Sequence, residues 1–144
     1  MKYLTLISLL LPINAFAVNV NCLVKAMIKA ESSGDPEAIN ITHIGVSYGL
    51  MQIQLSTAQD MGFRGTLAEL FKPAVNKKYG TRYIKYLLRR YHDQVYLSLD
   101  AYNRGMQKAE DYPYKGDWKN HPYVGKIIGF MEEICPVKVQ LSAN

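Results

Sequence analysis

The sequence has little of what metal-binding, redox-active and membrane-spanning proteins need. Among its 144 residues it contains only two cysteines and three histidines. Two cysteines are too few for a disulfide-dense scaffold. It has no Cys-x-x-Cys pair or Cys/His cluster to bind zinc, and the scattered histidines form no Ser/His/Asp order. No internal stretch approaches the roughly 20 apolar residues of a membrane-spanning helix. We therefore expect neither a metal nor a cofactor.

The composition is that of an ordinary globular protein. Hydrophobic residues make up 49% of the chain and charged residues 20%, which excludes a disordered, collagen-like or low-complexity protein. Lys and Arg number 17 against 12 Asp and Glu, a net charge of +5. The length predicts one domain.

The first 17 residues have the pattern of a cleavable signal peptide. Lys2 gives a short cationic start, an apolar run extends from Leu4 to Ile13, and Ala15-Phe16-Ala17 fits the small-x-small cleavage pattern. The run is short for a membrane anchor, and no charged stop follows it. We expect export to the periplasm or beyond, cleavage after Ala17, and a mature domain of residues 18–144.

The two cysteines lie near the two ends of this mature domain. Cys22 follows the expected cleavage site closely, and Cys135 lies close to the C-terminus. In an oxidising compartment the two favour a disulfide. A disulfide that closes so long a loop stabilises the fold by up to ~4–5 kcal/mol in the chain-entropy treatment. The alternative is two separate buried thiols.

Nearly every periodic segment of the mature chain has the helical period. A helix over 22–33 places Val24, Met27, Ile28 and Glu31 on one face. Further helices are expected from Ser56, as the N-cap, to Met61, at the capping box Thr66–Glu69, from Pro73 to Tyr91, from Asp93 to Tyr102, over 103–110, and from Pro122 to Glu133. The fold class is therefore mainly α.

The remaining segments are predicted from turn residues and from side-chain pattern. Residues 37–53 read as irregular with a short hairpin, residues 111–121 as a loop, and 136–144 as a frayed tail. The last helix is expected to bury Tyr123, Ile127, Phe130 and Ile134.

The helix from Pro73 to Tyr91 pairs an apolar stripe with a row of basic residues. The stripe is Tyr83, Ile84, Leu87, Leu88 and Tyr91, and the opposite row is Lys78, Arg82, Lys85 and Arg89. Such a row with interleaved tyrosines occurs in nucleic-acid binders. The export signal argues against that partner. A solvated face, or a surface that meets anionic groups of the cell wall, is the preferred interpretation.

Glu31 is the residue on which the functional interpretation depends. It ends an apolar stripe, where a carboxylate is costly unless it is paired or protonated. A partly buried Glu has a raised pKa, and this suits it to act as a general acid near neutral pH. A structural carboxylate turned to solvent is the alternative, and periodicity alone favours it.

Short motifs accompany Glu31 along the chain. They are Glu31-Ser32-Ser33-Gly34-Asp35-Pro36, then Gly49-Leu50-Met51-Gln52, then the segment from Pro73 to Ile84, then Ala101-Tyr102-Asn103-Arg104-Gly105, and a late Tyr123-Val124. They resemble the E-S-x-x-x-P, G-L-M-Q, P-x-x-N-I-x-x-G-x-x-Y-L, A-Y-N-x-G and Y-V segments of the soluble lytic transglycosylase family, relatives of goose-type lysozymes. The resemblance covers roughly residues 22–130, and motifs in this order and spacing are a strong signal.

The resemblance implies a compact, lysozyme-like, all-helical domain that cleaves peptidoglycan. The bond cleaved would be the β-1,4 bond between N-acetylmuramic acid and N-acetylglucosamine. Glu31 would protonate the glycosidic oxygen, and the substrate's N-acetyl carbonyl would stabilise the oxocarbenium-like centre. Glu31 would then take the proton of the 6-hydroxyl, whose oxygen closes onto C1 to give a 1,6-anhydro product.

A single carboxylate suffices for that reaction because the nucleophile is part of the substrate. Ordinary hydrolysis needs a second carboxylate nearby. Asp35, Glu37 and Asp60 are the candidates by sequence, and none occupies a motif position. We therefore expect transglycosylation, with a hydrolytic lysozyme and a noncatalytic peptidoglycan-binding scaffold as the alternatives.

The resemblance also assigns residues to the substrate site. Ser47, Met51 and Gln52 match positions that line the sugar site, where Met51 packs on a sugar face or simply fills the core. Gln52 contacts an N-acetyl or hydroxyl group or ties a turn.

Three later residues belong to the same site. Tyr102 and Asn103 orient Glu31 or the N-acetyl group, or end a helix. Tyr123 reaches the Glu31 region or packs in the core. Asn76, in the third motif, is expected to be structural.

The sequence departs from the family pattern in three places. The stretch from Glu31 to Gly49 is slightly longer than usual. Arg104 stands where the family has a small residue, and Asn120-His121-Pro122 replaces a Thr-rich approach to the late Tyr. The small size suggests a monomer that opens the wall locally for a secretion or pilus apparatus, or a phage-like role.

Overall fold

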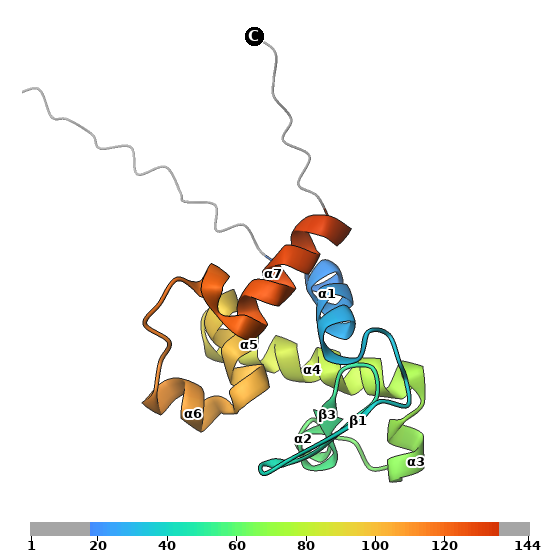
Figure 1. Ribbon diagram of the computed structural model, residues 1–144. Coiled ribbons are helices and arrows are strands. Elements are labelled where there is room, and N and C mark those ends of the chain that lie inside the picture. Colours follow the sequence, from blue (N-terminus) through green and yellow to red (C-terminus); the bar gives the residue numbers. More distant parts are fainter. Residues whose placement is uncertain (1–17, 136–144) are drawn as a thin grey trace, which may run out of the picture.

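A computed structural model of the chain describes residues 18–135 (Figure 1). Helices dominate these residues, as predicted, and a small sheet accompanies them. The elements in order are α1 (Val20–Ser32), β1 (Ile39–Thr42), β2 (Gly45–Tyr48), β3 (Ile53–Gln54), α2 (Leu55–Asp60), α3 (Leu67–Leu70), α4 (Pro73–Arg90), α5 (Val95–Arg104), α6 (Met106–Asp111), the 3-10 helix η1 (Trp118–Asn120) and α7 (Pro122–Ile134). The expected signal peptide and the tail from residue 136 lie outside the described residues.

Several helix boundaries follow the sequence signals. Asn19 caps α1, and its Oδ1 accepts from the backbone N–H of Cys22 at 3.1 Å. Thr66 and Glu69 form the predicted capping box of α3. Pro73 occupies the first turn of α4, where its missing N–H costs nothing, and the helix ends at Arg90 with Tyr91 as its C-cap.

Two predicted helix starts were wrong. Ser56 lies inside α2, which begins at Leu55, because strand β3 leads directly into the helix through Gln54 without a side-chain cap. Asp93 has φ of 61°, which lies outside the helical region, so α5 begins two residues later at Val95. The same helix continues past Tyr102 to Arg104.

The sheet is a small antiparallel meander with strand order β1-β2-β3. Ile39 of β1 pairs with Tyr48 of β2, and Ser47 of β2 pairs with Gln54 of β3. The hairpin predicted within residues 37–53 is confirmed, and β3 adds a strand to it. Figure 1 shows the sheet with α2 and α3 at one end of the domain, and α5 and α6 at the other.

The main core lies among α1, α4, α5 and α7. Its fully buried side chains include Leu23, Met27, Ile84, Leu99 and Ile127, each of which stabilises the fold by about 1.5–3 kcal/mol. A smaller cluster of Ile53, Ala58, Phe63 and Leu70 joins the sheet to α2 and α3.

The buried face of α7 differs from the predicted one. Val124 and Ile127 are buried, whereas Tyr123, Phe130 and Ile134 are half-buried. This helix packs on α5 as well as on α1, and the stripe that it buries therefore shifts to include Val124.

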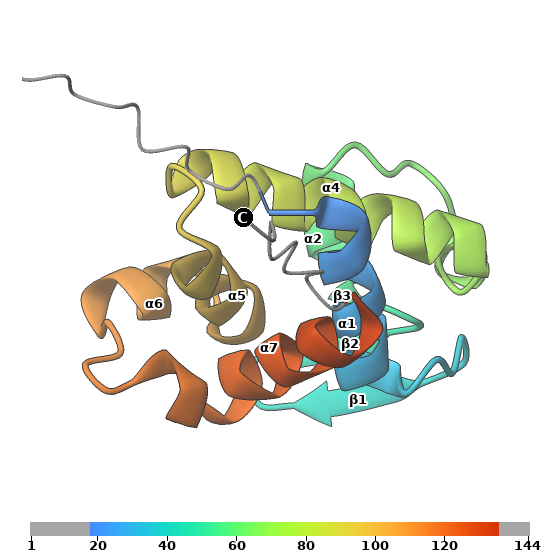
Figure 2. The same ribbon diagram turned by 90° about the horizontal axis from the view of Figure 1, so that it is seen from above.

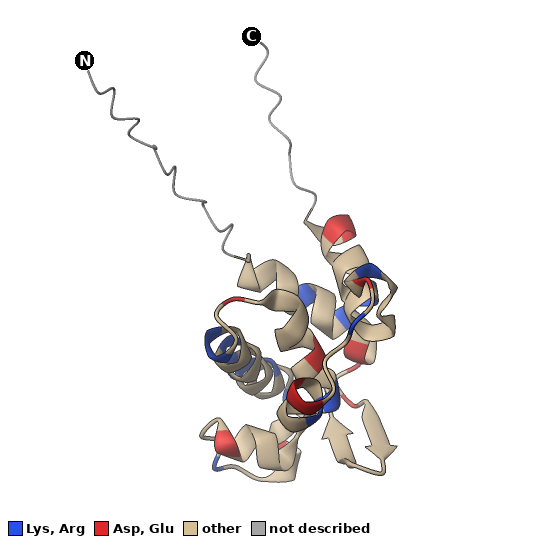
Figure 3. Cartoon of the chain, turned by 90° about the vertical axis from the view of Figure 1, so that its left-hand side faces the viewer, with Lys and Arg blue, Asp and Glu red and all other residues tan. Residues whose placement is uncertain are grey.

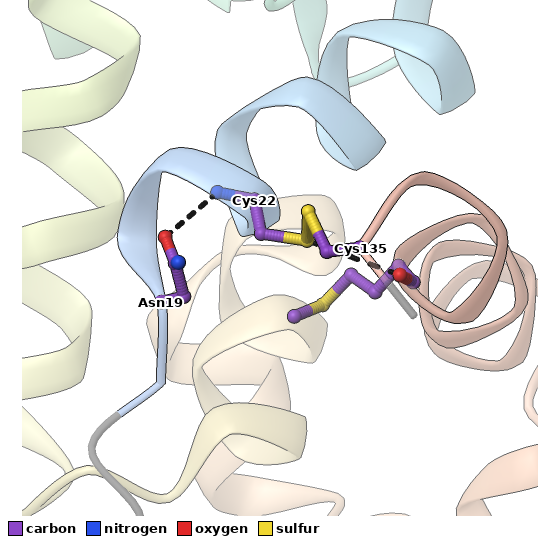
Figure 4. Close-up of a disulfide and its surroundings, with 4 residues drawn as sticks. Asn19, Cys22 and Cys135 are labelled. Carbon is purple, nitrogen blue, oxygen red and sulfur yellow. Dashed lines mark hydrogen bonds between the residues drawn. A yellow bond between two sulfur atoms is a disulfide. The ribbon is translucent and has the colours of Figure 1, made fainter. Parts of the chain in front are cut away.

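Helices α1 and α7 lie side by side in both views (Figures 1 and 2) and are joined covalently. Cys22 in the first turn of α1 is disulfide-bonded to Cys135, which follows α7, with 6.2 Å between their Cα atoms (Figure 4). The predicted pairing is confirmed. Lys29 of α1 and Glu133 of α7 add an ion pair at 2.8 Å.

Figure 3 shows that Lys, Arg, Asp and Glu are spread over several parts of the chain. The four basic residues of the α4 row are all solvent-exposed. In the part of the chain that the structure describes, no helix is long and apolar enough to cross a membrane, and no cluster of three His, Cys, Asp or Glu side chains could hold a metal ion.

Candidate active site

Glu31 lies in the last turn of α1, where the helix ends beside the sheet. Ser33 takes a left-handed conformation (φ 55°) and terminates the helix. The hydroxyl of Ser32 donates to the carbonyl of Leu50 at 2.8 Å, which fixes the end of α1 against the loop between β2 and β3. The first motif therefore fixes Glu31 in place by ending the helix and tying it to the second motif.

The carboxylate of Glu31 accepts a hydrogen bond from the phenol of Tyr123, the second residue of α7. Burial raises the pKa of Glu31 from its ordinary 4.5 to about 7, although the Tyr123 bond and the positive charge of Lys126 lower it. A carboxyl group with this pKa is substantially protonated at neutral pH and can deliver its proton.

Two phenols flank the carboxylate. Tyr102 of α5 donates to the carbonyl of Met51 at 2.8 Å, and its ring lies 5.1 Å from that of Tyr83. Burial and the nearby Glu31 charge hold the pKa values of both Tyr102 and Tyr123 well above the usual 10. Both therefore stay protonated and act as hydrogen-bond donors.

A cavity of about 230 Å³ opens beside Glu31, between the sheet and the helices. It is lined by side chains from the sheet and its loops and from α1, α2, α4 and α5: Glu31, Asn40, Thr42, Ile44, Ser47, Gln52, Ile53, Gln54, Thr57, Tyr83, Tyr102 and Asn103, with Gly105 at the end of α5. Among these residues Glu31 is the one carboxylate. Asp35, Glu37 and Asp60 are exposed and lie outside the lining.

Most of the predicted site residues meet at this cavity. Ser47, Gln52, Tyr102 and Asn103 line it, and Tyr123 reaches the carboxylate from α7. Gln52 also has the structural role considered above, since its amide nitrogen donates to the carbonyls of Ala38 and Gly49 at 3.0 and 2.9 Å.

Met51 departs from the predicted arrangement. The Met51 side chain is 0% exposed and packs on α4. A Cβ added to Gly80 of this helix would lie 2.6 Å from the Met51 Sδ. The side chain fills the core and does not reach the cavity. Its backbone contributes instead, because the Met51 carbonyl holds the Tyr102 phenol.

Asn76 holds the turn that carries the second motif, in line with its expected structural role. Its side chain is fully buried, accepts from the backbone N–H of Met51 at 2.9 Å, and donates to the carbonyls of Tyr48 and Leu70 at 2.8 and 3.1 Å. Gly49 has φ of +70°, and a Cβ there would lie 2.4 Å from the Asn76 amide nitrogen. Only glycine fits this approach.

The hairpin contributes residues to the cavity that were not predicted from the sequence. Asn40, Thr42 and Ile44 line the cavity from β1 and the turn that follows it. The alternation of Asn40 and Thr42 with Ile39 and Ile41 is a period-2 pattern that could have placed the polar pair on one face. Tyr83 was predicted as part of an apolar stripe, and Thr57 carried no signal.

Comparisons with known proteins show a family and a similar fold. The transglycosylase SLT domain family matches the chain over residues 15–121, an interval that ends before Tyr123. The solved structure of an inactive mutant of lytic transglycosylase Slt from Pseudomonas aeruginosa is similar, with 18% identity and a TM-score of 0.67 over 78% of this chain and 21% of that one.

A second similar structure is the 70 kDa soluble lytic transglycosylase Slt70 from Escherichia coli. Its identity is 20% and its TM-score 0.63, over 76% of this chain and 21% of that one. The chain thus spans about a fifth of the length of these two proteins. At this identity, the likeness concerns the fold.

Proposed function

The chain belongs to the transglycosylase SLT domain family, and from that membership we propose that it is a peptidoglycan lytic transglycosylase with Glu31 as its single acid and base. The observation that carries the proposal is the state of Glu31. It is the carboxylate that lines the cavity, its pKa is raised to about 7, and it is bonded to Tyr123.

In the first step Glu31 acts as an acid. Its proton passes to the glycosidic oxygen as the bond from that oxygen to C1 of N-acetylmuramic acid breaks. The carbonyl of the substrate's own N-acetyl group stabilises the positive charge that develops at C1. Tyr123 donates to the carboxylate that this step creates, and Tyr102 contributes a second nearby phenol.

In the second step the Glu31 carboxylate acts as a base. It takes the proton of the 6-hydroxyl while that oxygen bonds to C1, which closes the 1,6-anhydro ring and regenerates the acid. No water is consumed. A protein nucleophile is unnecessary because the attacking oxygen is held within the same sugar.

Among the described residues that line the cavity, Glu31 is the one carboxylate, and this supports transglycosylation over hydrolysis. Hydrolytic glycosidases place two carboxyl groups about 5–10 Å apart across the scissile bond. Asp35, Glu37 and Asp60 are exposed and outside the cavity lining. A hydrolytic lysozyme remains the alternative that the product analysis below distinguishes.

The remaining parts of the proposal concern location and partners. The signal pattern over residues 1–17 supports export, and peptidoglycan lies in the compartment that this export reaches. We further propose that the enzyme acts as a monomer on glycan strands and opens the wall locally for a secretion or pilus apparatus.

The experiment is a digest of purified peptidoglycan by residues 18–144, with the products analysed by mass spectrometry. Glu31→Gln is the test variant, and Glu37→Gln, an exposed carboxylate outside the cavity, is the matched control. Products that end in 1,6-anhydro-N-acetylmuramic acid, absent with Glu31→Gln and retained with Glu37→Gln, are expected. Reducing ends, one water heavier, would identify a hydrolase. Cleavage by neither the wild type nor the control, with both folded and oxidised, would favour a binding module.

A further inference from the structure

A buried polar cluster lies beneath the start of α7, and the proposed reaction does not use it. Its centre is Asp100 of α5, which is 0% exposed. Arg104, one turn further along α5, donates to both carboxylate oxygens of Asp100, from Nε at 2.5 Å and from Nη2. The Nε2 atom of His121 lies 3.2 Å from the Asp100 Oδ1. The cluster is therefore a buried carboxylate held by two partners.

The hydrogen bonds of His121 determine which of its nitrogens carries the proton. Its Nδ1 accepts from the backbone N–H groups of Tyr123 and Val124 at 3.3 and 3.2 Å. A nitrogen that accepts two hydrogen bonds carries no proton, so the proton of the neutral ring is on Nε2. That N–H lies against the Asp100 carboxylate, with Nε2 3.2 Å from its Oδ1. The carboxylate thus selects the tautomer that can cap α7.

The cap connects this cluster to Glu31. One of the two N–H groups that His121 holds belongs to Tyr123, and the phenol of the same residue donates to Glu31. The orientation of the first turn of α7 determines where this phenol lies. A continuous set of contacts therefore runs from Asp100 through His121 and Tyr123 to Glu31.

The cluster also brings together two of the positions at which the sequence departs from the motifs that it resembles. Arg104 replaces a small residue, and His121 belongs to the segment that replaces a Thr-rich approach to Tyr123. The two positions are 17 residues apart (121 − 104), yet both side chains contact Asp100. Helix caps are ordinarily Ser, Thr, Asp or Asn. A histidine that caps only in one tautomer, beside a buried carboxylate that fixes it, indicates a specific arrangement.

We propose that His121, held in its Nε2–H tautomer by Asp100, is a positioning residue that orients the Tyr123 phenol toward Glu31. For its effect on turnover the inference rests on the proposed function. The position of the phenol and the protonation of Glu31 can be measured without any substrate.

The test uses oxidised residues 18–144 and three variants. His121→Ala removes both the cap and the contact with Asp100. His121→Asn restores a side chain that caps helices well and, like the Ala variant, cannot carry the imidazole charge. His92→Asn, at an exposed histidine in the turn before α5, is the matched control. Circular dichroism confirms that each variant is folded.

The first readout is the pKa of Glu31, from an NMR titration of its side-chain carboxyl carbon. The titratable or charged groups that face Glu31 are Tyr123 and Lys126 of α7 and Tyr102 of α5, and neither phenol ionises near neutral pH. If His121 orients Tyr123, His121→Ala weakens the bond that lowers the pKa of Glu31, and that pKa rises by about 0.5 or more. His121→Asn should bring the pKa of Glu31 most of the way back to its wild-type value, and His92→Asn should leave that pKa unchanged.

The second readout is kinetic, and the third is spectroscopic. On peptidoglycan we expect His121→Ala to lose roughly tenfold in kcat with KM changed less than about twofold, because positioning affects the transition state more than binding. Long-range ¹H–¹⁵N spectra of the wild type should show the His121 proton on Nε2.

The inference is overturned by either of two results. One is a proton on Nδ1 of His121 in the wild type. The other is a folded His121→Ala variant in which Glu31 titrates as before. If His121→Ala does not fold, the tautomer of His121 in the wild type still decides. A wild type that cleaves no peptidoglycan would contradict the proposed function and leave the titration and the tautomer as valid tests of positioning.

Discussion

The phenol of Tyr123 donates a hydrogen bond to the carboxylate of Glu31, across a sequence separation of 92 residues. The two residues sit at the adjoining ends of α1 and α7, and the Cys22–Cys135 disulfide joins the opposite ends of the same helices. The carboxylate and its donor are therefore carried by a covalently closed pair of helices.

The first prediction is the pH dependence of activity. Glu31 must be protonated to act as an acid, and its pKa is about 7. We therefore expect kcat/KM on peptidoglycan to fall as pH rises through about 7, with the alkaline limb reporting Glu31 in the free enzyme. The measurement is the rate of release of soluble fragments between pH 5 and 9. A rate that is still rising at pH 9 would contradict this assignment.

The second prediction concerns Tyr123→Phe. The ring keeps its packing, but Glu31 loses the donor that lowers its pKa. The alkaline limb should therefore move to higher pH, and the rate at its optimum should fall by roughly tenfold to a hundredfold, since the carboxylate formed in the first step loses a charge-assisted hydrogen bond. Tyr96→Phe, an exposed tyrosine outside the cavity lining, is the control. An alkaline limb at the same pH as in the wild type would mean that the hydrogen bond between Tyr123 and Glu31 does not form in solution.

The third prediction links Glu31 to stability. Its pKa in the folded protein lies above the ordinary 4.5, so between pH 4.5 and 7 the folded state binds more protons than the unfolded state. The contribution of Glu31 is fully present below about pH 4.5 and is lost as pH rises through about 7. Glu31→Gln lacks this titration. The difference in free energy of unfolding, variant minus wild type, should therefore increase by up to about 3 kcal/mol between pH 4 and pH 8.

Urea unfolding at both pH values measures this difference. Glu37→Gln, at an exposed position, should show no such gain between the two pH values. If Glu31→Gln tracks the wild type across this range, the carboxylate is hydrated and its pKa is not raised.

The parts of the fold that were predictable are those set by local signals. Three such signals depend on neighbouring residues only: the capping box of Thr66 and Glu69, the proline at the start of α4, and the helical period of the long segments. The predicted start of α5 was wrong because His92 and Asp93 adopt positive φ values of 51° and 61°, which no local pattern in the sequence required. The buried stripe of α7 was shifted because it packs on two helices, and neither contact is encoded within α7.

The site shows the same division. Glu31 could be singled out because it ends an apolar stripe and stands in the first of several motifs that resemble those of a known family, whereas periodicity alone favoured a structural carboxylate. The side chain of Met51 could not be assigned, since only its approach to Gly80 of α4 shows that it is core. The contact of His121 with Asp100 was unpredictable for a similar reason, whereas Arg104 lies one turn from Asp100 on the same helix. The sequence marked both residues as departures, but only the packing of α5 against the start of α7 brings them to one carboxylate.

The fourth prediction concerns the disulfide. The bridge joins residues 113 apart, and closing so long a loop in the unfolded chain stabilises the fold by up to about 4–5 kcal/mol in the chain-entropy treatment. Reduction should lower the denaturation midpoint strongly, and the double variant Cys22→Ser with Cys135→Ser should match the reduced wild type. The measurement is denaturant unfolding with and without dithiothreitol. A double variant as stable as the oxidised wild type would contradict the prediction.

The fifth prediction concerns Asn76, whose side chain ties Met51, Tyr48 and Leu70 to α4 through their backbone groups. Asn76→Ala leaves these buried groups without partners and should destabilise the fold by about 2–4 kcal/mol. Asn21→Ala, on the exposed face of α1, should change stability by less than about 0.5 kcal/mol.

Asn76→Asp separates hydrogen bonding from packing at the same position. It preserves the shape and the acceptor for the Met51 N–H, but it replaces the amide that donates to two carbonyls by an oxygen. If the hydrogen bonds hold the turn, the Asp variant should be as unstable at neutral pH as the Ala variant, and both should lose activity, because the turn carries Gln52 and the carbonyl that holds Tyr102. Thermal unfolding and the peptidoglycan assay measure both effects. An Asp variant with wild-type stability would show that Asn76 acts through its volume alone.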